Sequence, residues 1–311
     1  MTSCFVATPE FRVIRLHTRY RRDLTEDRTR EKNRAEKLLE SAAIKVSSVV
    51  SDLHGTTGRD IMDQLIAGQR DPRALAQLAR TRARRKITEL QHALEGAEFF
   101  TPEHAALLKA MLARIDRVEE EIARLTTVIE RLLAPYEEQL AQAESMPGWG
   151  HRAAQDAIAE TGIDMTRFRT GAHLASWAGR TPLDNQSGKR TGRAKSKKGN
   201  RYLAGLLGET AVAAGRTQTR EGARYRKIAR RRGKNQACVA LGNTQLRVYH
   251  KLLSSPGMRY EDPGPDYYER RRDIRRQIAH HVGKLGDLGF EVTLCRIPEP
   301  GPDGPAGTQA A

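Results

Sequence analysis

One serine in this chain stands where it could act as a nucleophile. Ser187 comes directly before Gly188 and is followed by a dense run of basic residues. No apolar residue longer than alanine occurs between Leu183 and Tyr202, so we expect an exposed loop, because neither a buried strand nor an amphipathic helix face fits this composition. The cations of this loop are Lys189, Arg190, Arg193, Lys195, Lys197, Lys198 and Arg201.

The chemistry that suits such a serine is phosphoryl transfer. A serine hydroxyl is a weak nucleophile at neutral pH and needs activation or a strongly stabilised transition state. Phosphoryl transfer depends mostly on positioning and on neutralising the charge of the equatorial oxygens. Lys189, Arg190 and Arg193 would supply that positive charge while Ser187 attacks a phosphodiester and is held as a phosphoserine. The alternative is a solvated basic loop without specific chemistry.

The sequence offers poor candidates for a metal site. Asp60 and Asp63 lie three residues apart on an expected short helix, without a partner strand that carries further acids, and Asp184 stands alone. His280 and His281 are adjacent, and adjacent residues on a helix do not face one another. The three cysteines form no CxxC pair, which argues against a disulfide framework and against a zinc site. We expect no metal ligand and no cofactor in this chain.

The net charge narrows the choice of partners. Lysine and arginine exceed aspartate and glutamate to give a formal charge of +16, and a field of this size favours nucleic acid or an acidic membrane surface. No run of about 18 apolar residues is present, so no spanning helix is expected, and the amino terminus lacks the layout of a signal peptide. Nucleic acid is therefore the expected partner, with no membrane, and the cytoplasm is the expected location.

A second basic run strengthens the nucleic-acid interpretation. Between residues 216 and 234 nine cations accompany one acid, Glu221. Neutralising phosphates releases counterions, so such a patch would bind tightly, with strong salt dependence and little sequence preference. The candidate contacts in it are Arg224, Arg226, Lys227, Arg230, Arg231 and Arg232. The alternative is a solvated basic helix face.

A third candidate is the glycine-rich turn at residues 147–150. Pro147-Gly148-Trp149-Gly150 resembles the hairpin of a helix-hairpin-helix module. The backbone amides of Gly148 and Gly150, next to a helix N-terminus, could hold a phosphate without reading bases. The alternative is an ordinary glycine-rich connection between helices.

The elements that must position these residues are expected to be mostly α-helical. Thr101-Pro102 starts a helix that runs to Ala134, and its apolar residues recur at alternating spacings of three and four. Such a seven-residue repeat predicts a coiled-coil seam, which serves either self-association or an antiparallel hairpin within the monomer. The seam residues are Leu108, Met111, Ile115, Val118, Ile122, Leu125, Ile129 and Leu132.

Other segments complete the expected fold. Helices are predicted at residues 20–53, 61–66, 73–80, 84–94, 200–214 and 236–253, and Asp71-Pro72 predicts an N-cap followed by a proline in the first turn. Residues 290–294 predict a short closing strand, and the Pro/Gly-rich end predicts disorder.

Several stretches together resemble the transposases of the insertion-sequence one-ten family, also described as bridge-RNA-guided recombinases. They are the stretch from residues 18 to 72, MPGWGHRAAQDAIAETG, AHLASWAGRTP, NQSGKRTGRAKSKKGNRYL, YEDPGPDYYERRR and GFEVTL. The resemblance implies a carboxyl-terminal transposase domain with Ser187 as nucleophile and Ser196 as the rival. It also implies a coiled coil for homo-oligomer assembly and a structured RNA from the element that supplies sequence choice.

The resemblance also sets the expected domains. Residues 1–17 resemble the tail of a RuvC-like domain, 18–97 a helical region and 98–140 the coiled coil. Residues 141–296 would be the transposase domain with a helix-hairpin-helix-like start, and 297–311 a disordered tail. In that family acidic ligands in the RuvC-like domain hold Mg²⁺, and Met1 falls after them, so Mg²⁺ is expected only with that missing domain. The expected function is DNA transposition by a serine nucleophile, inactive in this chain alone. The alternative is a non-enzymatic nucleic-acid-binding remnant that assembles with full-length transposase.

Overall fold

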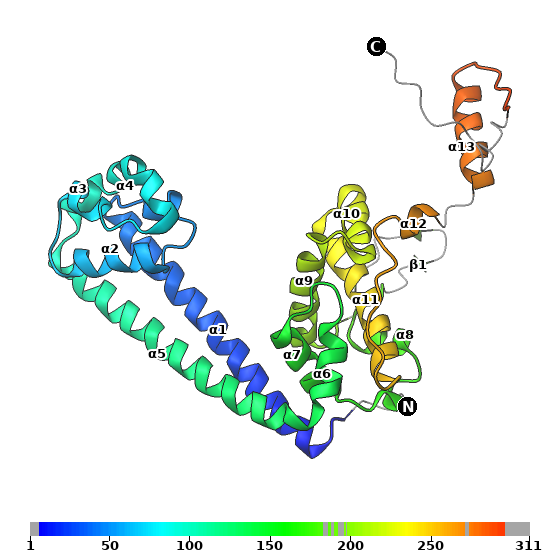
Figure 1. Ribbon diagram of the computed structural model, residues 1–311, viewed down its shortest axis with the longest axis horizontal. Coiled ribbons are helices and arrows are strands. Elements are labelled where there is room, and N and C mark those ends of the chain that lie inside the picture. The colour runs from blue at the N-terminus through cyan, green and yellow to red at the C-terminus, as the bar shows by residue number, and fades with distance from the viewer. Residues whose placement is uncertain are drawn as a thin grey trace, which may run out of the picture.

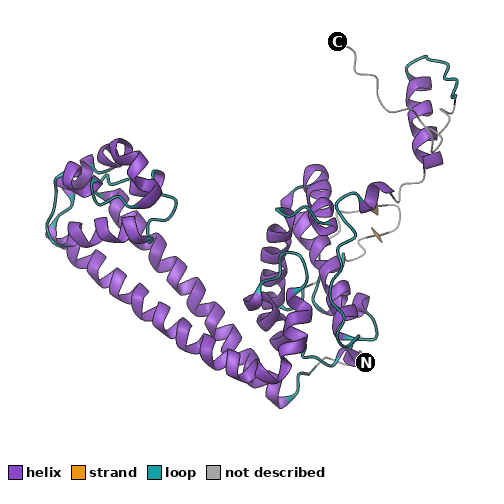
Figure 2. Ribbon diagram, viewed as in Figure 1, coloured by secondary structure: helices purple, strands orange, loops and turns teal. Residues whose placement is uncertain are grey.

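The computed structural model describes residues 6–182, 186–187, 190–191, 196, 198–270 and 274–295. Helices dominate these residues (Figure 2), which confirms the mostly α prediction. Two short strands, β1 (Gln186–Ser187) and β2 (Arg190–Thr191), pair antiparallel, with Ser187 opposite Arg190. In the described part of the chain, no helix is both long and apolar enough to cross a bilayer.

Two long helices, α1 (Pro9–Ser41) and α5 (Pro102–Leu133), run antiparallel beside each other and form an arm (Figure 1). Along the predicted seam of α5, buried and half-buried residues alternate, so that the buried ones lie seven residues apart in the sequence. The buried set is Leu108, Ile115, Ile122 and Ile129, and the half-buried set is Met111, Val118, Leu125 and Leu132.

The apolar edge of α5 is therefore used within the chain. Of the two interpretations of the repeat, the structure shows the antiparallel hairpin within the monomer, because α1 covers the edge that self-association would use. Self-association stays a prediction. The predicted boundary after residue 17 falls inside α1, which starts at Pro9 and already buries Phe11 and Ile14. The helix predicted from residue 20 to 53 ends at Ser41.

The end of the arm carries a group of short helices, here called the head. Asp71 caps one of them as predicted, because its side chain accepts a hydrogen bond from the Arg73 amide at 2.9 Å. A separate apolar core that includes Leu65, Leu75 and Leu90 fills the head. Its elements are η1 (Val46–Ser48), α2 (Thr56–Ile66), α3 (Pro72–Ala76), η2 (Thr81–Lys86), α4 (Ile87–Ala93) and η3 (Glu95–Phe99).

The other end of the arm joins a helical domain with its own core. Trp149 stacks on Tyr249 there, with ring centroids 5.4 Å apart. The helix predicted from residue 200 begins at Arg201, and Asn200 caps it, since the Asn200 side chain accepts from the amides of Tyr202 and Leu203. The elements are η4 (Ala134–Tyr136), α6 (Glu137–Glu144), α7 (His151–Thr161), η5 (Met165–Arg167), α8 (Gly171–Trp177), α9 (Arg201–Gly215), α10 (Arg220–Arg232) and α11 (Lys234–Leu253).

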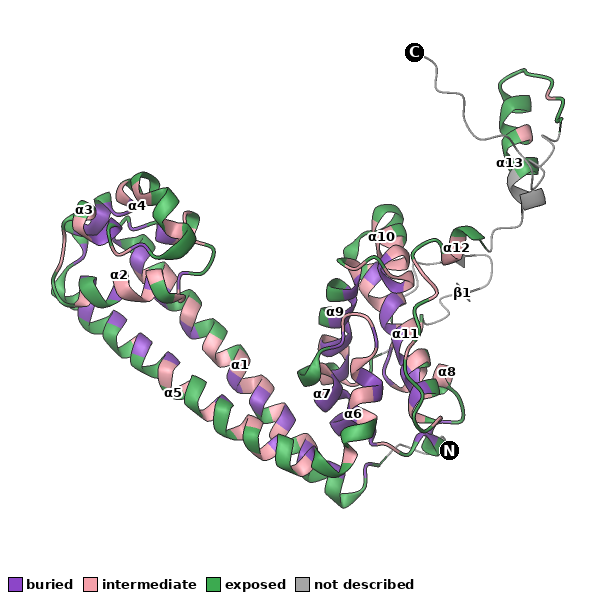
Figure 3. Ribbon diagram, in the orientation of Figure 1, coloured by how far each residue is buried: buried purple, intermediate pink, exposed green. Residues whose placement is uncertain are grey.

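The predicted closing strand is wrong. Beyond α12 (Tyr267–Arg270) and α13 (Ile274–Asp287), residues 290–294 have no regular structure. Phe290 and Leu294 are 63% and 62% exposed, and Figure 3 shows α13 exposed along most of its described length. A strand is stabilised by pairing with a neighbour, and in the described residues β1 and β2 pair only with each other.

Candidate nucleic-acid interface

The loop that contains Ser187 leaves and rejoins the helical domain at one place. Pro182 and Ser196 form an antiparallel bridge there. Gly199 lies so close to the backbone of Ala178 that a Cβ at this position would come within 2.5 Å of the Ala178 carbonyl. Only glycine allows this approach, so the base of the loop is fixed against the end of α8.

Arg180 secures the same base from the other side. Its guanidinium donates a hydrogen bond to the Ala204 carbonyl, and its own carbonyl accepts one from Asn243 Nδ2 at 2.9 Å. Burial lowers the pKa of Arg180. Since these partners lie on α9 and α11, three helices hold the two ends of the basic loop together.

A buried carboxylate, Glu160, links the loop base to the arm. Arg19 donates to it through two nitrogens, at 2.7 and 2.8 Å, and Asn200 Nδ2 donates to the same carboxylate. Glu160 is 2% exposed. Asn200 thus caps α9 with its oxygen and donates to Glu160 with its nitrogen, so this one residue joins the start of α9 to Glu160.

Arginines of α1 hold α7 along this contact. Arg15 donates to the carbonyls of Ala159 and Glu160, at 3.2 and 2.7 Å, in the last turn of α7, where backbone acceptors lack helical partners. The hydrogen bond to Glu160 raises the pKa of Arg19, whereas burial lowers the pKa of Arg15. We call Arg15, Arg19, Glu160 and Asn200 the arm–loop clamp.

The two glycines of the turn before α7 have different roles. Gly148 has φ +80°, and a Cβ on it would lie 2.4 Å from the Thr210 carbonyl oxygen and 2.5 Å from the Ala214 nitrogen. It is therefore a close-packing residue between the turn and α9. Gly150 has no atom within 4 Å of its Cβ position and caps α7 without a side chain. Its surroundings are open to a ligand.

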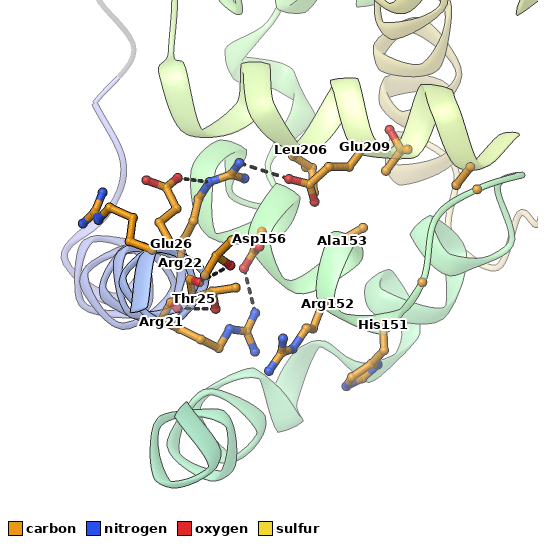
Figure 4. Close-up of a pocket in the computed structure, with 16 residues that line it drawn as sticks. Arg21, Arg22, Thr25, Glu26, His151, Arg152, Ala153, Asp156, Leu206 and Glu209 are labelled. Atoms are coloured by element: carbon orange, nitrogen blue, oxygen red, sulfur yellow. Dashed lines mark hydrogen bonds and ion pairs between the residues drawn. The ribbon is translucent and has the colours of Figure 1, made fainter. Parts of the chain in front are cut away.

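Gly150 opens into a cavity of about 690 Å³ between α1, α7 and α9 (Figure 4). Arg21, which is 3% exposed, lines it and donates to Gln155 and Asp156, both at 2.7 Å. The next residue of α1, Arg22, donates to Glu209 of α9 at 3.1 Å. Most charges in this cavity are therefore already paired.

Arg152, in the first turn of α7, differs from its neighbours. No carboxylate of the described residues lies within ion-pair distance of it, and it lines the same cavity. Burial, and then the positive charge of Arg21, lower its pKa. An anion in the cavity would relieve this crowding of cations, and a phosphate beside Gly150 is the fitting group.

The second basic run forms the exposed side of α10. A smaller cavity of about 140 Å³ lies between α10 and α12, and no acidic residue lines it. The Arg224 guanidinium lies over the Tyr268 ring, 5.7 Å from its centre. Within the described part of the chain none of the four cations around this cavity has a carboxylate partner; they are Arg224, Lys227, Arg231 and Arg232.

One predicted contact in this run, Arg226, has a structural role in the described residues. Arg226 donates to the carbonyls of Gly215 and Thr217, at 2.9 and 2.7 Å, and to Gln218. It therefore closes the turn between α9 and α10. The next residue, Lys227, and Arg230 are exposed on α10, as the basic interpretation expects.

The structure describes only some of the predicted residues of the loop. The backbones of Ser187 and Arg190 are register partners in the β1–β2 pair, and Ser196 forms the bridge to Pro182. Lys198 is exposed, and the Arg201 guanidinium lies over the Tyr202 ring at 4.6 Å. The predicted contacts Lys189, Arg193, Lys195 and Lys197 lie outside the described residues.

Sequence reasoning missed the arginines of α1. Arg15, Arg19 and Arg22 recur at spacings of four and three, which places them on one face of a helix. That pattern indicates a charged face, but two of the carboxylates that pair with it, Glu160 and Glu209, lie more than a hundred residues away along the chain.

A metal site among the described residues would need several ligating side chains that converge on one point. No group of three or more histidine, cysteine, aspartate or glutamate side chains converges among the described residues. The residues present thus do not match the acidic ligand set that Mg²⁺ takes, and no reaction step is assigned to a metal held by them.

Comparison with known proteins gives consistent matches. Residues 140–226 match the model of the transposase IS116/IS110/IS902 family. A probable family 20 transposase of Pseudomonas aeruginosa is 34% identical over 155 residues, which cover 47% of this chain and 41% of that protein.

Two further relatives extend the match. An uncharacterized 42 kDa protein of insertion element IS900 from Mycobacterium paratuberculosis is 29% identical over 77% of this chain and 63% of its own length. The transposase for insertion sequence element IS1111A of Coxiella burnetii is 29% identical over 50% of this chain and 43% of its own length. The matches thus cover less than two thirds of each of these relatives.

Proposed function

The chain belongs to the IS116/IS110/IS902 family of transposases, and on this basis we propose that it acts in DNA transposition by binding nucleic-acid backbones and presenting Ser187 to a phosphodiester. The observation that carries the binding part is the cavity between α10 and α12, which four cations and no acid line. Unpaired cations on an exposed helix repel one another, and a phosphate backbone would neutralise them.

The proposed reaction conserves the energy of the phosphodiester. Attack by Ser187 Oγ forms a new bond to phosphorus and breaks the bond from phosphorus to one deoxyribose oxygen. The serine proton is passed to that leaving oxygen, so one phosphate ester replaces another, and the reverse attack rejoins a strand. The arm–loop clamp supports this role because it holds the end of the loop that carries the serine.

Three further proposals follow from the family. A structured RNA from the element would select the DNA sequence, and a second copy of the chain would assemble with the first. Mg²⁺ would be held by acidic residues other than the described ones. The cationic surfaces support nucleic acid as partner, since their chemistry suits the phosphates of DNA and RNA equally.

A covalent-adduct assay tests the serine. Fluorescent duplexes that contain the element's ends are incubated with the protein, with and without the element's RNA and Mg²⁺, and resolved on a denaturing gel. We expect an adduct that Ser187→Ala abolishes and Ser196→Ala preserves. An adduct that survives Ser187→Ala assigns the nucleophile to another residue. Binding without any adduct under all conditions favours the non-enzymatic alternative.

A further inference from the structure

The head carries a basic surface of its own, at the opposite end of the arm from the helical domain (Figure 1). The segment from Arg80 to Lys86 contains five cations in seven residues, and all five are exposed. Its 3₁₀ helix, η2, buries none of its residues, and Ala83 only packs against the edge of the head core. These cations therefore contribute little to the packing of the head.

Few of these charges are paired. Arg80 binds Asp60 at 2.6 Å, and Lys86 donates to the Val49 carbonyl at 2.9 Å. Arg82 and Arg85 have no carboxylate partner among the described residues. In a 3₁₀ helix residues three apart lie in line, so Arg82 and Arg85 project from the same edge.

A groove of about 580 Å³ lies beside this segment. Arg80, Arg82 and Lys86 line it together with Thr56 and Thr57, and the Thr57 hydroxyl accepts a hydrogen bond from the Arg80 amide at 3.0 Å. Asp52 is the one acid among the lining residues, all of which are described, and its carboxylate already accepts from the His54 amide. Guanidinium, ammonium and hydroxyl donors around an open groove fit phosphate oxygens.

We propose that the head binds a phosphate backbone through Arg82, Arg85 and Lys86, as a site separate from α10 and from the cavity at Gly150. This rests on the proposed function in that all three surfaces would serve nucleic acid. The 20 residues of α1 between Arg21 and Ser41 span roughly 30 Å at the rise of an α-helix. This is close to the length of one turn of duplex, about 34 Å, so a duplex could reach from the helical domain to the head.

Salt-dependent binding tests the site. The affinity of the full chain for labelled duplex DNA of 10 and 30 base pairs, and for an RNA hairpin with a stem of 30 base pairs, is measured by fluorescence anisotropy between 50 and 300 mM KCl. The variant is Arg82→Ala/Arg85→Ala. The matched control is Arg117→Ala/Arg131→Ala, which removes two exposed cations of α5.

We expect the head variant to lower the slope of log affinity against log salt by about 2 on a 30-base-pair ligand, because each phosphate contact contributes about 0.9. The slope on the 10-base-pair duplex and the slopes of the control should not change. Loss on DNA alone or on RNA alone identifies which backbone the head holds.

An unchanged slope on both long ligands overturns the proposal and assigns the surface to a protein partner or to solubility. A parallel variant, Arg224→Ala/Arg231→Ala, separates this failure from that of the proposed function. If the α10 variant weakens binding and the head variant does not, only the head site fails. If the unmodified chain binds neither DNA nor RNA, both fail.

Discussion

Replacing Glu160 by glutamine should loosen the arm–loop clamp without changing its shape. The substitution removes the negative charge of the Glu160 side chain, which is 3% exposed, and leaves Arg15 and Arg19 facing a neutral amide. It also places an amide nitrogen where either Arg19 or Asn200 now donates. Removing one partner of a fully buried ion pair costs about 3–5 kcal/mol.

The partial exposure of the arginines reduces this cost. The side chains of Arg15 and Arg19 are 18% and 33% exposed, so water screens part of the uncompensated charge. We expect Glu160→Gln to lower the free energy of unfolding by about 2–3 kcal/mol. For a domain of this size the melting temperature should fall by roughly 5 °C.

Urea unfolding followed by tryptophan fluorescence suits the measurement. Trp149 and Trp177 both belong to the core of the helical domain, so the signal reports the part that the clamp holds. Glu209→Gln is the matched control, since Glu209 pairs with Arg22 but is 72% exposed. An exposed pair of this kind should contribute less than about 1 kcal/mol.

A double-mutant cycle with Asn200→Ala tests whether the clamp acts as one unit. Asn200→Ala removes the cap of α9 and should itself cost about 1 kcal/mol. Because Asn200 and Glu160 are in contact, the double variant should lose about 1 kcal/mol less than the sum of the single losses. Additivity within about 0.3 kcal/mol, or equal effects of Glu160→Gln and Glu209→Gln, would refute the clamp.

Three further predictions concern particular residues. Gly148→Ala should cost about 2–4 kcal/mol in urea unfolding, because φ is +80° and the new Cβ meets the backbone of α9, whereas Gly150→Ala should change stability by less than about 0.5 kcal/mol; equal costs would contradict the separate roles of these glycines. Ala43 follows α1 with φ +60°, so Ala43→Gly should raise stability by roughly 0.5–1 kcal/mol in thermal melts followed by circular dichroism, and a loss would show that no strain is relieved. Burial raises the pKa of Tyr249, and burial together with a hydrogen bond to Glu10 raises the pKa of Tyr136 to about 12. Above about pH 10 the folded chain therefore holds more protons than the unfolded chain does, so the free energy of unfolding is kept below that pH and falls as the pH rises. Tyr249→Phe should make this fall less steep in urea titrations.

The sequence predicted those helix starts that depend on contacts between residues close together in the chain. Asp71 caps its helix as the sequence indicated, and a helix begins next to Asn200 as predicted, because a capping side chain needs only the amides two or three residues ahead. The seven-residue repeat of α5 likewise predicted its buried edge. It did not identify the partner, since an apolar edge is covered equally well by a second copy or by α1.

The candidate site was harder to predict because its contacts join distant segments. Gly148 and Gly150 look alike in the sequence, and only the approach of α9 makes one a packing residue and leaves the other open. Arg226 and Lys227 are adjacent in one basic run, yet Arg226 closes a turn while Lys227 remains exposed. Composition predicts that a surface is basic, but the backbone acceptors nearby decide which cations stay free for a ligand.

The clamp also joins two parts that the sequence separates. α1 is one wall of the arm, and the same helix supplies Arg15 and Arg19 to the end of α7. Glu160 also accepts a hydrogen bond from Asn200, the N-cap residue of α9 at the end of the basic loop. The base of the loop that carries Ser187 is therefore held by hydrogen bonds that begin on a helix of the arm.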